Sequence, residues 1–255
     1  MNLGRISRLA LLSIGVVLML GTAFGTTISF VPAVSGPFSP PGPTRTFGGL
    51  IVANGYYYNG SAWSQTGVVL WGRNESDDHG LGVCNPNEGT KCGTSGSSGN
   101  GDWNELSNEI SPELIVLQLP AGYDWTSVQL SSLDNNDGGT APLERGILWA
   151  SASGDPSGPR TLICDFVAGG GGASTCFGST SSVEPSIQFS GLLAGFANSS
   201  YLVFQPYDWS GHHYTNNDFL LASAVLNTVP EPSSMLLMGA GLLGLAGGVR
   251  RKFCI

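Results

Sequence analysis

The chain has 255 residues and a formal net charge of −8, with 41% hydrophobic and 11% charged residues. Five of its ten basic residues lie close to the two ends, so residues 26–231 combine five basic with 18 acidic side chains, a net charge of −13. Such an acidic surface excludes nucleic acid as a natural partner. The apolar fraction is too high for a disordered chain, and about 200 residues suffice for one domain with its own core.

The N-terminus has the three parts of a secretory signal peptide. Arg5 and Arg8 give the positive start, Leu9 to Leu20 is an almost unbroken apolar stretch, and small residues lead to a cleavage site after Gly25. A membrane-spanning helix needs about twenty apolar residues, and this stretch ends too early for one. We therefore expect residues 1–25 to be a signal peptide and the domain that follows to be exported.

From residue 26 to residue 228 the hydrophobic pattern has the period of β-strands. Short apolar or alternating runs are bounded by Gly, Pro, Asn, Asp or Ser, which is typical of strands joined by turns. No amphipathic helical pattern longer than two turns interrupts them. We expect one all-β domain over residues 26–228, an antiparallel, jelly-roll-like β-sandwich. The expected strands are 67–73, 113–120, 125–133, 145–151, 160–167, 186–193, 201–209 and 218–226.

Four cysteines lie in this domain, in two pairs that each bracket a turn-rich segment. Four cysteines allow three pairings, and an exported domain matures in an oxidising compartment. We expect local disulfides, Cys84 with Cys92 and Cys164 with Cys176. The fifth cysteine, Cys254, lies beyond an apolar segment, where a reducing compartment gives it no need of a partner. A zinc site is disfavoured because the chain has no Cys-x-x-Cys pair.

Oxygen-bearing side chains gather before two of the expected strands. Asp102, Glu105 and Asn108 precede the strand at 113–120, and Asp218 begins the last strand. Calcium prefers several carboxylate and amide oxygens, so these four residues form a candidate calcium site. The competing interpretation is that they only end strands and cap turns. No other cofactor is indicated.

The sequence gives little sign of catalysis. The chain has three histidines and none of the H-E-x-x-H, G-x-S-x-G or Walker patterns. His212 and His213 lie in a polar segment next to aromatic residues, and a loop is the favoured interpretation. We therefore expect a protein that is not an enzyme.

The six tryptophans all lie in the exported part. Aromatic rings bury well in the cores of sandwiches and also stack on the apolar faces of sugars. We expect most of them in the core. Trp103 and Trp209 lie in polar loops and are the candidates for contact with a glycan.

The C-terminal segment, residues 229–255, combines three features. Pro230, Glu231 and Pro232 form a Pro-Glu-Pro triplet, and a glycine-rich apolar run of about fifteen residues follows, about 22 Å long as a helix against a bilayer core of about 30 Å. A basic cluster then holds the C-terminus in the cytoplasm by the positive-inside rule. We expect a short transmembrane helix that stops translocation, with the basic cluster made of Arg250, Arg251 and Lys252.

The order of triplet, glycine-rich span and basic cluster closely resembles the PEP-CTERM sorting signal. The resemblance implies recognition and cleavage by an exosortase, an integral-membrane cysteine protease of Gram-negative bacteria that make exopolysaccharide. It also implies a precursor held transiently in the inner membrane and a product at the cell surface or outside the cell. The alternative is an ordinary weak tail anchor that carries the triplet by chance.

Two further segments, "DDHGLGVCNPNEGTKC" and "GDWNELSNEISPELIVLQLP", are similar to blocks of PEP-CTERM passenger domains. That similarity implies a β-rich surface domain and assigns no activity. We therefore expect a protein associated with the cell surface or the extracellular matrix. The alternatives are a carbohydrate-binding β-sandwich that acts on exopolysaccharide, and a hydrolase in which His212 or His213 faces a carboxylate.

Overall fold

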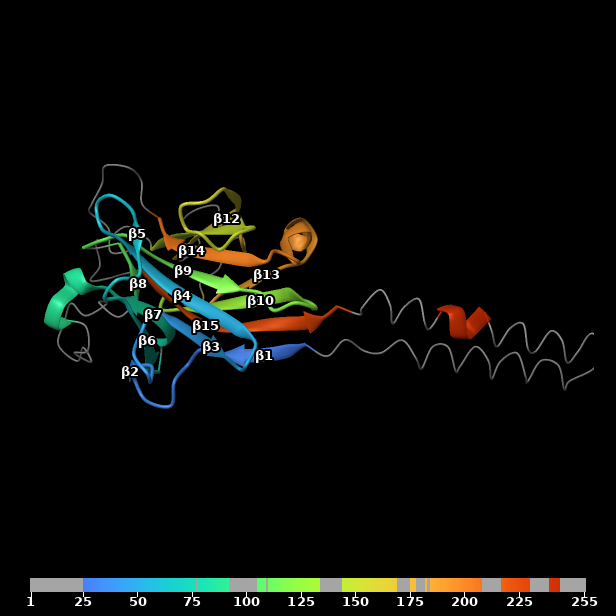
Figure 1. The fold of residues 1–255 in the computed structure, drawn as a ribbon, viewed down its shortest axis with the longest axis horizontal. Coiled ribbons are helices and arrows are strands. Elements are labelled where there is room, and N and C mark those ends of the chain that lie inside the picture. The colour runs from blue at the N-terminus through green and yellow to red at the C-terminus, as the bar shows by residue number, and fades with distance from the viewer. Residues whose placement is uncertain are drawn as a thin grey trace, which may run out of the picture.

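The computed structural model describes residues 25–76, 78–91, 105–108, 110–133, 144–168, 175–177, 182, 184–207, 217–229 and 239–243. Within them the chain forms two antiparallel β-sheets that pack face to face (Figure 1). The prediction of an all-β antiparallel sandwich is confirmed. Jelly-roll connectivity is not confirmed and stays a prediction.

The first sheet has the order β13-β10-β15-β7-β6-β2, with β1 and β8 also paired to β15. β15 is its longest strand and lies in its middle, because the apolar sequence of its first half is buried on both sides. Its strands are β1 (Thr26–Ser29), β2 (Gly36–Pro37), β6 (Val69–Asn74), β7 (His79–Cys84), β8 (Leu106–Ser107), β10 (Tyr123–Ser131), β13 (Ser186–Gln188) and β15 (Asp218–Thr228).

The second sheet has the order β12-β11-β14-β9-β4-β3, with β5 paired to β4. In β4, buried and half-buried residues alternate, as expected for a strand with one face on the core. Its strands are β3 (Thr44–Phe47), β4 (Ile51–Tyr58), β5 (Trp63–Ser64), β9 (Glu113–Gln118), β11 (Arg145–Ser151), β12 (Arg160–Val167) and β14 (Tyr201–Pro206). Two short 3-10 helices, η1 (Pro86–Lys91) and η3 (Gly191–Phe196), lie between strands.

Side chains from the inner faces of both sheets form one core. Phe166 of the second sheet meets Phe219 of the first edge to face, with ring centroids 5.0 Å apart. Gly146 makes this packing possible, because a Cβ there would lie 2.2 Å from Cζ of Phe166. Gly80, with φ +145°, lets β7 approach β15, because a Cβ there would lie 2.5 Å from the carbonyl oxygen of Leu221.

The expected strands are present, most of them with shifted ends, and the one at 186–193 is much shorter than expected. The run at 186–193 is a strand only as far as Gln188, and η3 follows from Gly191. Strands in the glycine-rich and polar segments were not expected from the sequence; the main ones are β1, β3, β4 and β7.

Candidate functional site

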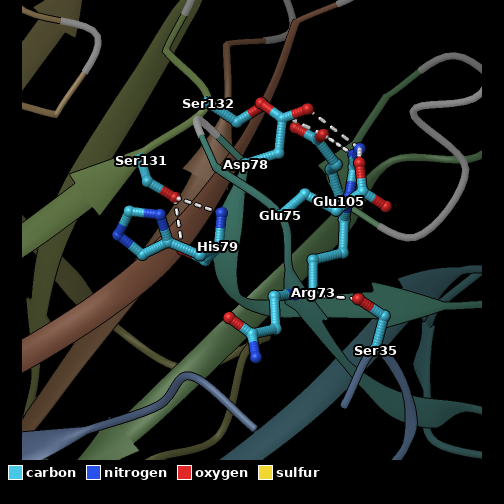
Figure 2. A network of polar contacts seen from close by, with 9 residues as sticks. Ser35, Arg73, Glu75, Asp78, His79, Glu105, Ser131 and Ser132 are labelled. Carbon is cyan, nitrogen blue, oxygen red and sulfur yellow. Dashed lines mark hydrogen bonds and ion pairs between the residues drawn. The ribbon is translucent and has the colours of Figure 1, made fainter. Parts of the chain in front are cut away.

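The end of the sandwich that holds β7 and β8 contains a buried ion-pair network around Arg73 of β6 (Figure 2). The guanidinium binds the carboxylate of Glu105, which is fully buried, and its Nη2 lies 3.0 Å from Oδ2 of Asp78 and 3.6 Å from Oε2 of Glu75. The Oγ of Ser132 lies 2.9 Å from Asp78 Oδ1 and from Glu105 Oε1. The network therefore joins β6, the turn before β7, the segment before β8 and the end of β10.

Ser132 has φ of +58°, in the left-handed region that residues other than glycine rarely adopt. Next to it, the Ser131 hydroxyl donates to the carbonyl of His79, whose amide in turn donates to Ser131 Oγ at 3.3 Å. Nε2 of His79 lies 3.6 Å from Oε1 of Glu184. These contacts hold the strained backbone of Ser132 in place against β7.

The two sequence blocks that resemble passenger domains meet at this network. Their Gly-Leu-Gly-Val part lies in β7, and Glu105 precedes β8. The amide of Val83 donates to the carbonyl of Glu105 at 3.4 Å, and both strands pair with β15. Glu105 thus forms a buried ion pair with Arg73, and its sequence context did not indicate this role.

The other candidate calcium ligands lie nearby. Asn108 donates to the carbonyl of Tyr207 at 3.1 Å and accepts from the amide of Asn217 at 3.3 Å, and Asp218 pairs with Ser107. Asp102 is outside the described residues. The structure thus brings Glu105, Asn108 and Asp218 to one end of β15, with Glu105 and Asn108 already bound to protein groups. No cluster of three or more metal-ligating side chains occurs among the residues described.

A second buried group at this end contains two hydrogen-bonded carboxyl groups, Glu88 of η1 and Glu113 at the start of β9. Glu113 accepts from Asn85 Nδ2 at 2.8 Å and from the amide of Ser107 at 2.9 Å, and Glu88 accepts from the amide of Asn85 at 2.9 Å. Burial, and then the neighbouring charge of Glu88, raise the pKa of Glu113 well above its usual value. Because Glu113 is fully buried, a proton that the pair binds is shielded from solvent.

The outer face of the second sheet carries a separate aromatic cluster, which we call the outer aromatic face. Its half-buried rings surround three buried aliphatic residues, Leu114, Val116 and Val203. The rings belong to Tyr56, Trp63, Trp149 and Tyr201.

Polar groups border the outer aromatic face. The Arg160 guanidinium lies 5.2 Å from the ring centroid of Trp149, and its Nη1 donates to Oε1 of Gln205 at 3.3 Å. Burial lowers the pKa of Arg160, and burial together with the charge of Asp155 raises the pKa of the Tyr56 hydroxyl. The face thus combines ring surfaces with one cation, an arrangement able to stack on apolar faces and bind polar substituents.

The glycan candidates named from the sequence, Trp103 and Trp209, lie outside the described residues, as do His212 and His213. Of the other tryptophans, Trp125 is in the core, where its Nε1 donates to the carbonyl of Ser199 at 2.8 Å. Trp63 and Trp149, expected in the core, instead lie half-buried on the outer face. Strand alternation through "RGILWAS" places Trp149 opposite in direction to the buried Leu148, and this signal was available in the sequence.

The disulfide between Cys164 and Cys176 is present as expected. Cys84 is also disulfide-bonded. Its expected partner, Cys92, is outside the described residues, so that pairing stays a prediction, and Cys254 lies outside them too.

The domain ends close to the sorting triplet. β15 runs to Thr228, and the amide of Val229 donates to the carbonyl of Gly122 at 2.8 Å. Pro230, Glu231, Pro232 and the basic cluster Arg250, Arg251 and Lys252 are outside the described residues. Of the expected transmembrane helix, residues 239–243 are described and are helical. Among the residues that the structure describes, no helix is long and apolar enough to cross a membrane.

Comparison with known proteins identifies a motif in one part of the chain. No curated protein and no solved structure matches the chain. A family model described as the PEP-CTERM protein-sorting motif matches residues 228–252, which begin at the last residue of β15 and include the triplet and the basic cluster. The chain therefore carries a PEP-CTERM sorting motif directly after the last strand of its β-sandwich.

Proposed function

We propose that this chain is a non-catalytic surface protein of a Gram-negative bacterium. An exosortase sorts the protein into the cell envelope or the extracellular matrix. The PEP-CTERM motif at residues 228–252 carries the proposal, because it marks an exported protein that exosortase sorts. The position of the motif supports the proposal further. The backbone is hydrogen-bonded to the domain as far as Val229, directly after β15, so the motif begins where the folded domain ends. The calcium site predicted from the sequence stays a prediction.

The triplet itself is the part to test. Two prolines keep the backbone extended and exclude a helix, which favours engagement by a protease. In a host that has an exosortase, the unaltered chain should lose the mass of its C-terminal segment. Changing Pro230, Glu231 and Pro232 to alanine should trap full-length protein in the membrane, whereas Ser233→Ala with Ser234→Ala, the matched control, should be processed normally. Processing of the triplet variant at the normal rate would contradict the proposal.

A second candidate function is the binding of exopolysaccharide by the β-domain, and the outer aromatic face favours it. Half-buried Tyr and Trp rings with a neighbouring guanidinium are the groups that contact sugars through ring stacking and hydrogen bonds. Tyr58, at the margin of this face, is 37% exposed and lies edge to face against Trp63, with centroids 5.7 Å apart. These rings come from neighbouring strands, so they offer a surface of fixed shape.

Binding of exopolysaccharide fragments, measured by calorimetry, tests this second function. Trp63→Ala should weaken binding, because it removes one ring of the outer aromatic face. Trp71→Ala is the matched control, because Trp71 is also half-buried but lies on β6 of the first sheet. Equal binding by the two variants, or no binding by the unaltered protein, would rule out this face as the site.

A further inference from the structure

The two ends of the β-domain lie at the same end of the sandwich (Figure 1). β1 pairs with β15 so that Thr26 is opposite Leu226, and the chain therefore enters and leaves the domain side by side. We call this the tail-side end. It consists of the turns 48–50, 119–122 and 152–159, η3 with residues 197–200, and residues 225–229.

The tail-side end carries few charges, although the domain as a whole is strongly acidic. Of the segments that define it, only the turn 152–159 contains a charged residue, Asp155. Two more charges border it, because Asp124 is opposite Asn227 and Arg160 begins β12. The ion pairs of Arg73 and the buried Glu88–Glu113 pair lie instead at the opposite end, with β7 and β8. A bilayer that contains anionic lipid repels carboxylates, so this is the end of the domain that it repels least.

Two large apolar side chains are exposed at the tail-side end, Leu192 and Val229, and Leu192 is the more exposed. Leu192 of η3 is 98% exposed, whereas its neighbour Leu193 is buried in the core. Hydrogen bonds fix η3 to β10 on both sides: the amide of Phe189 donates to Thr126 at 2.9 Å, and the amide of Trp125 donates to Ala197 at 2.7 Å. Leu192 is thus held outward by a well-anchored turn beside β10, the strand that pairs with the last residues of β15.

We propose that the tail-side end rests on the lipid surface while the sorting tail is in the membrane, with Leu192 inserted among the lipid head groups. Apolar side chains surrounded by uncharged or basic residues bind to this interfacial layer. The tail keeps the domain at the membrane, so a weak contact suffices to orient it, because the effective concentration of the surface is high. The inference rests on the membrane-held tail of the proposed function. It predicts that β15 meets the membrane end-on and that the outer aromatic face stays accessible.

Photo-crosslinking of the full chain tests this orientation. A diazirine analogue of leucine is placed at position 192, and the protein is exported in a Gram-negative host without exosortase. The control carries the analogue at position 34, because Val34 is 78% exposed and its neighbours Ala33 and Ser35 contact Asn74, next to Arg73 at the opposite end. After irradiation of isolated inner membranes, peptides are analysed for phosphatidylethanolamine and phosphatidylglycerol adducts.

We expect lipid adducts at position 192 and none above background at position 34. Both positions are exposed, so the analogue disturbs the fold at neither. If the protein is in the membrane fraction but position 192 gives no adduct, or both positions react equally, the proposed orientation is wrong and the membrane-held tail stands. If the protein is found only in the soluble periplasmic fraction, the membrane-held tail is wrong and the orientation falls with it.

Discussion

The buried pair of Glu88 and Glu113 should make the folded domain less stable as the pH rises. Burial and the charge of Glu88 raise the pKa of Glu113 in the folded state, whereas the unfolded chain releases this proton near the usual value of 4.5. Above that value the folded state holds one proton more than the unfolded state. The free energy of unfolding should therefore fall by about 1.4 kcal/mol per pH unit until the raised pKa is passed, and change no further from this cause above it.

Glu88→Gln should narrow the pH range of this dependence with little loss of packing, because burial, the larger cause of the raised pKa of Glu113, remains and only the charge of Glu88 is removed. The amide oxygen of the new side chain can accept from the amide of Asn85, as Glu88 Oε2 does now at 2.9 Å. Its NH2 group can donate to the carboxylate of Glu113, which then no longer faces a second acid. Glu113→Gln is a different case, because both Glu113 oxygens already accept hydrogen bonds, from Asn85 and Ser107. In Glu113→Gln, an NH2 group replaces one of these oxygens and then faces the N–H donor of Asn85 or of Ser107. The unmade hydrogen bond should lower the free energy of unfolding by about 1–3 kcal/mol.

Urea unfolding of the full chain, repeated from about pH 5 upward, measures this effect as a slope. The difference between the unaltered protein and Glu88→Gln isolates the pair, because other titrating groups contribute equally to both. Asp124→Asn is the control, because Asp124 lies away from the pair on β10. If the stability of Glu88→Gln stops falling at the same pH as that of the unaltered protein, Glu88 does not raise the pKa of Glu113 and the reasoning is wrong.

Three further predictions concern the stability of the fold. Replacing Cys164 and Cys176 by alanine should lower the free energy of unfolding by about 3 kcal/mol, because the unfolded chain then regains the entropy of a loop with a sequence separation of 12. Reduction of the disulfide in the unaltered protein should lower the free energy of unfolding by at least as much. Gly146→Ala should lower the free energy of unfolding by about 1–3 kcal/mol, and with it the melting temperature, because the new methyl group would overlap Phe166. Gly195→Ala is the control and should lower the free energy of unfolding less, because a Cβ there meets no atom within 4 Å. Glu105→Gln should cost about 3–5 kcal/mol, because it removes the buried charge that Arg73 binds, and a denaturation midpoint close to that of the unaltered protein would refute this role.

The fold class could be predicted because the long strands carry their own signal. β9, β11, β12 and β15 are apolar or alternating over six residues or more, and turn-forming residues flank them. β4 and β7 were missed for the opposite reason. "IVANGYYY" and "HGLGVC" contain glycines, which lower the intrinsic preference for strands, and only their partners in the sheet stabilise them.

The polar networks could not be predicted, because their partners are distant in sequence. Arg73 and Glu105 are 32 residues apart, and Asn85 and Glu113 are 28 apart. Carboxylates and amides that gather before a strand favour a calcium site when they are read from the sequence alone. The sequence does not show that one of them, Glu105, already binds the guanidinium of Arg73. The aromatic cluster posed a different problem, because strand alternation assigns Trp149 to a face of its strand but does not say whether that face meets the core.

The arrangement of β15 connects the sorting motif to the rest of the molecule. Its first residues pair with β8, beside the Arg73 network. Its last residues pair with β1 and β10 at the tail-side end, and one residue, Val229, separates the strand from the triplet. A central strand that is paired on both sides resists fraying, so the protease must act on chain beyond Val229 while the domain stays folded. In the orientation proposed above, the end that holds the Arg73 network is therefore the end directed away from the bilayer.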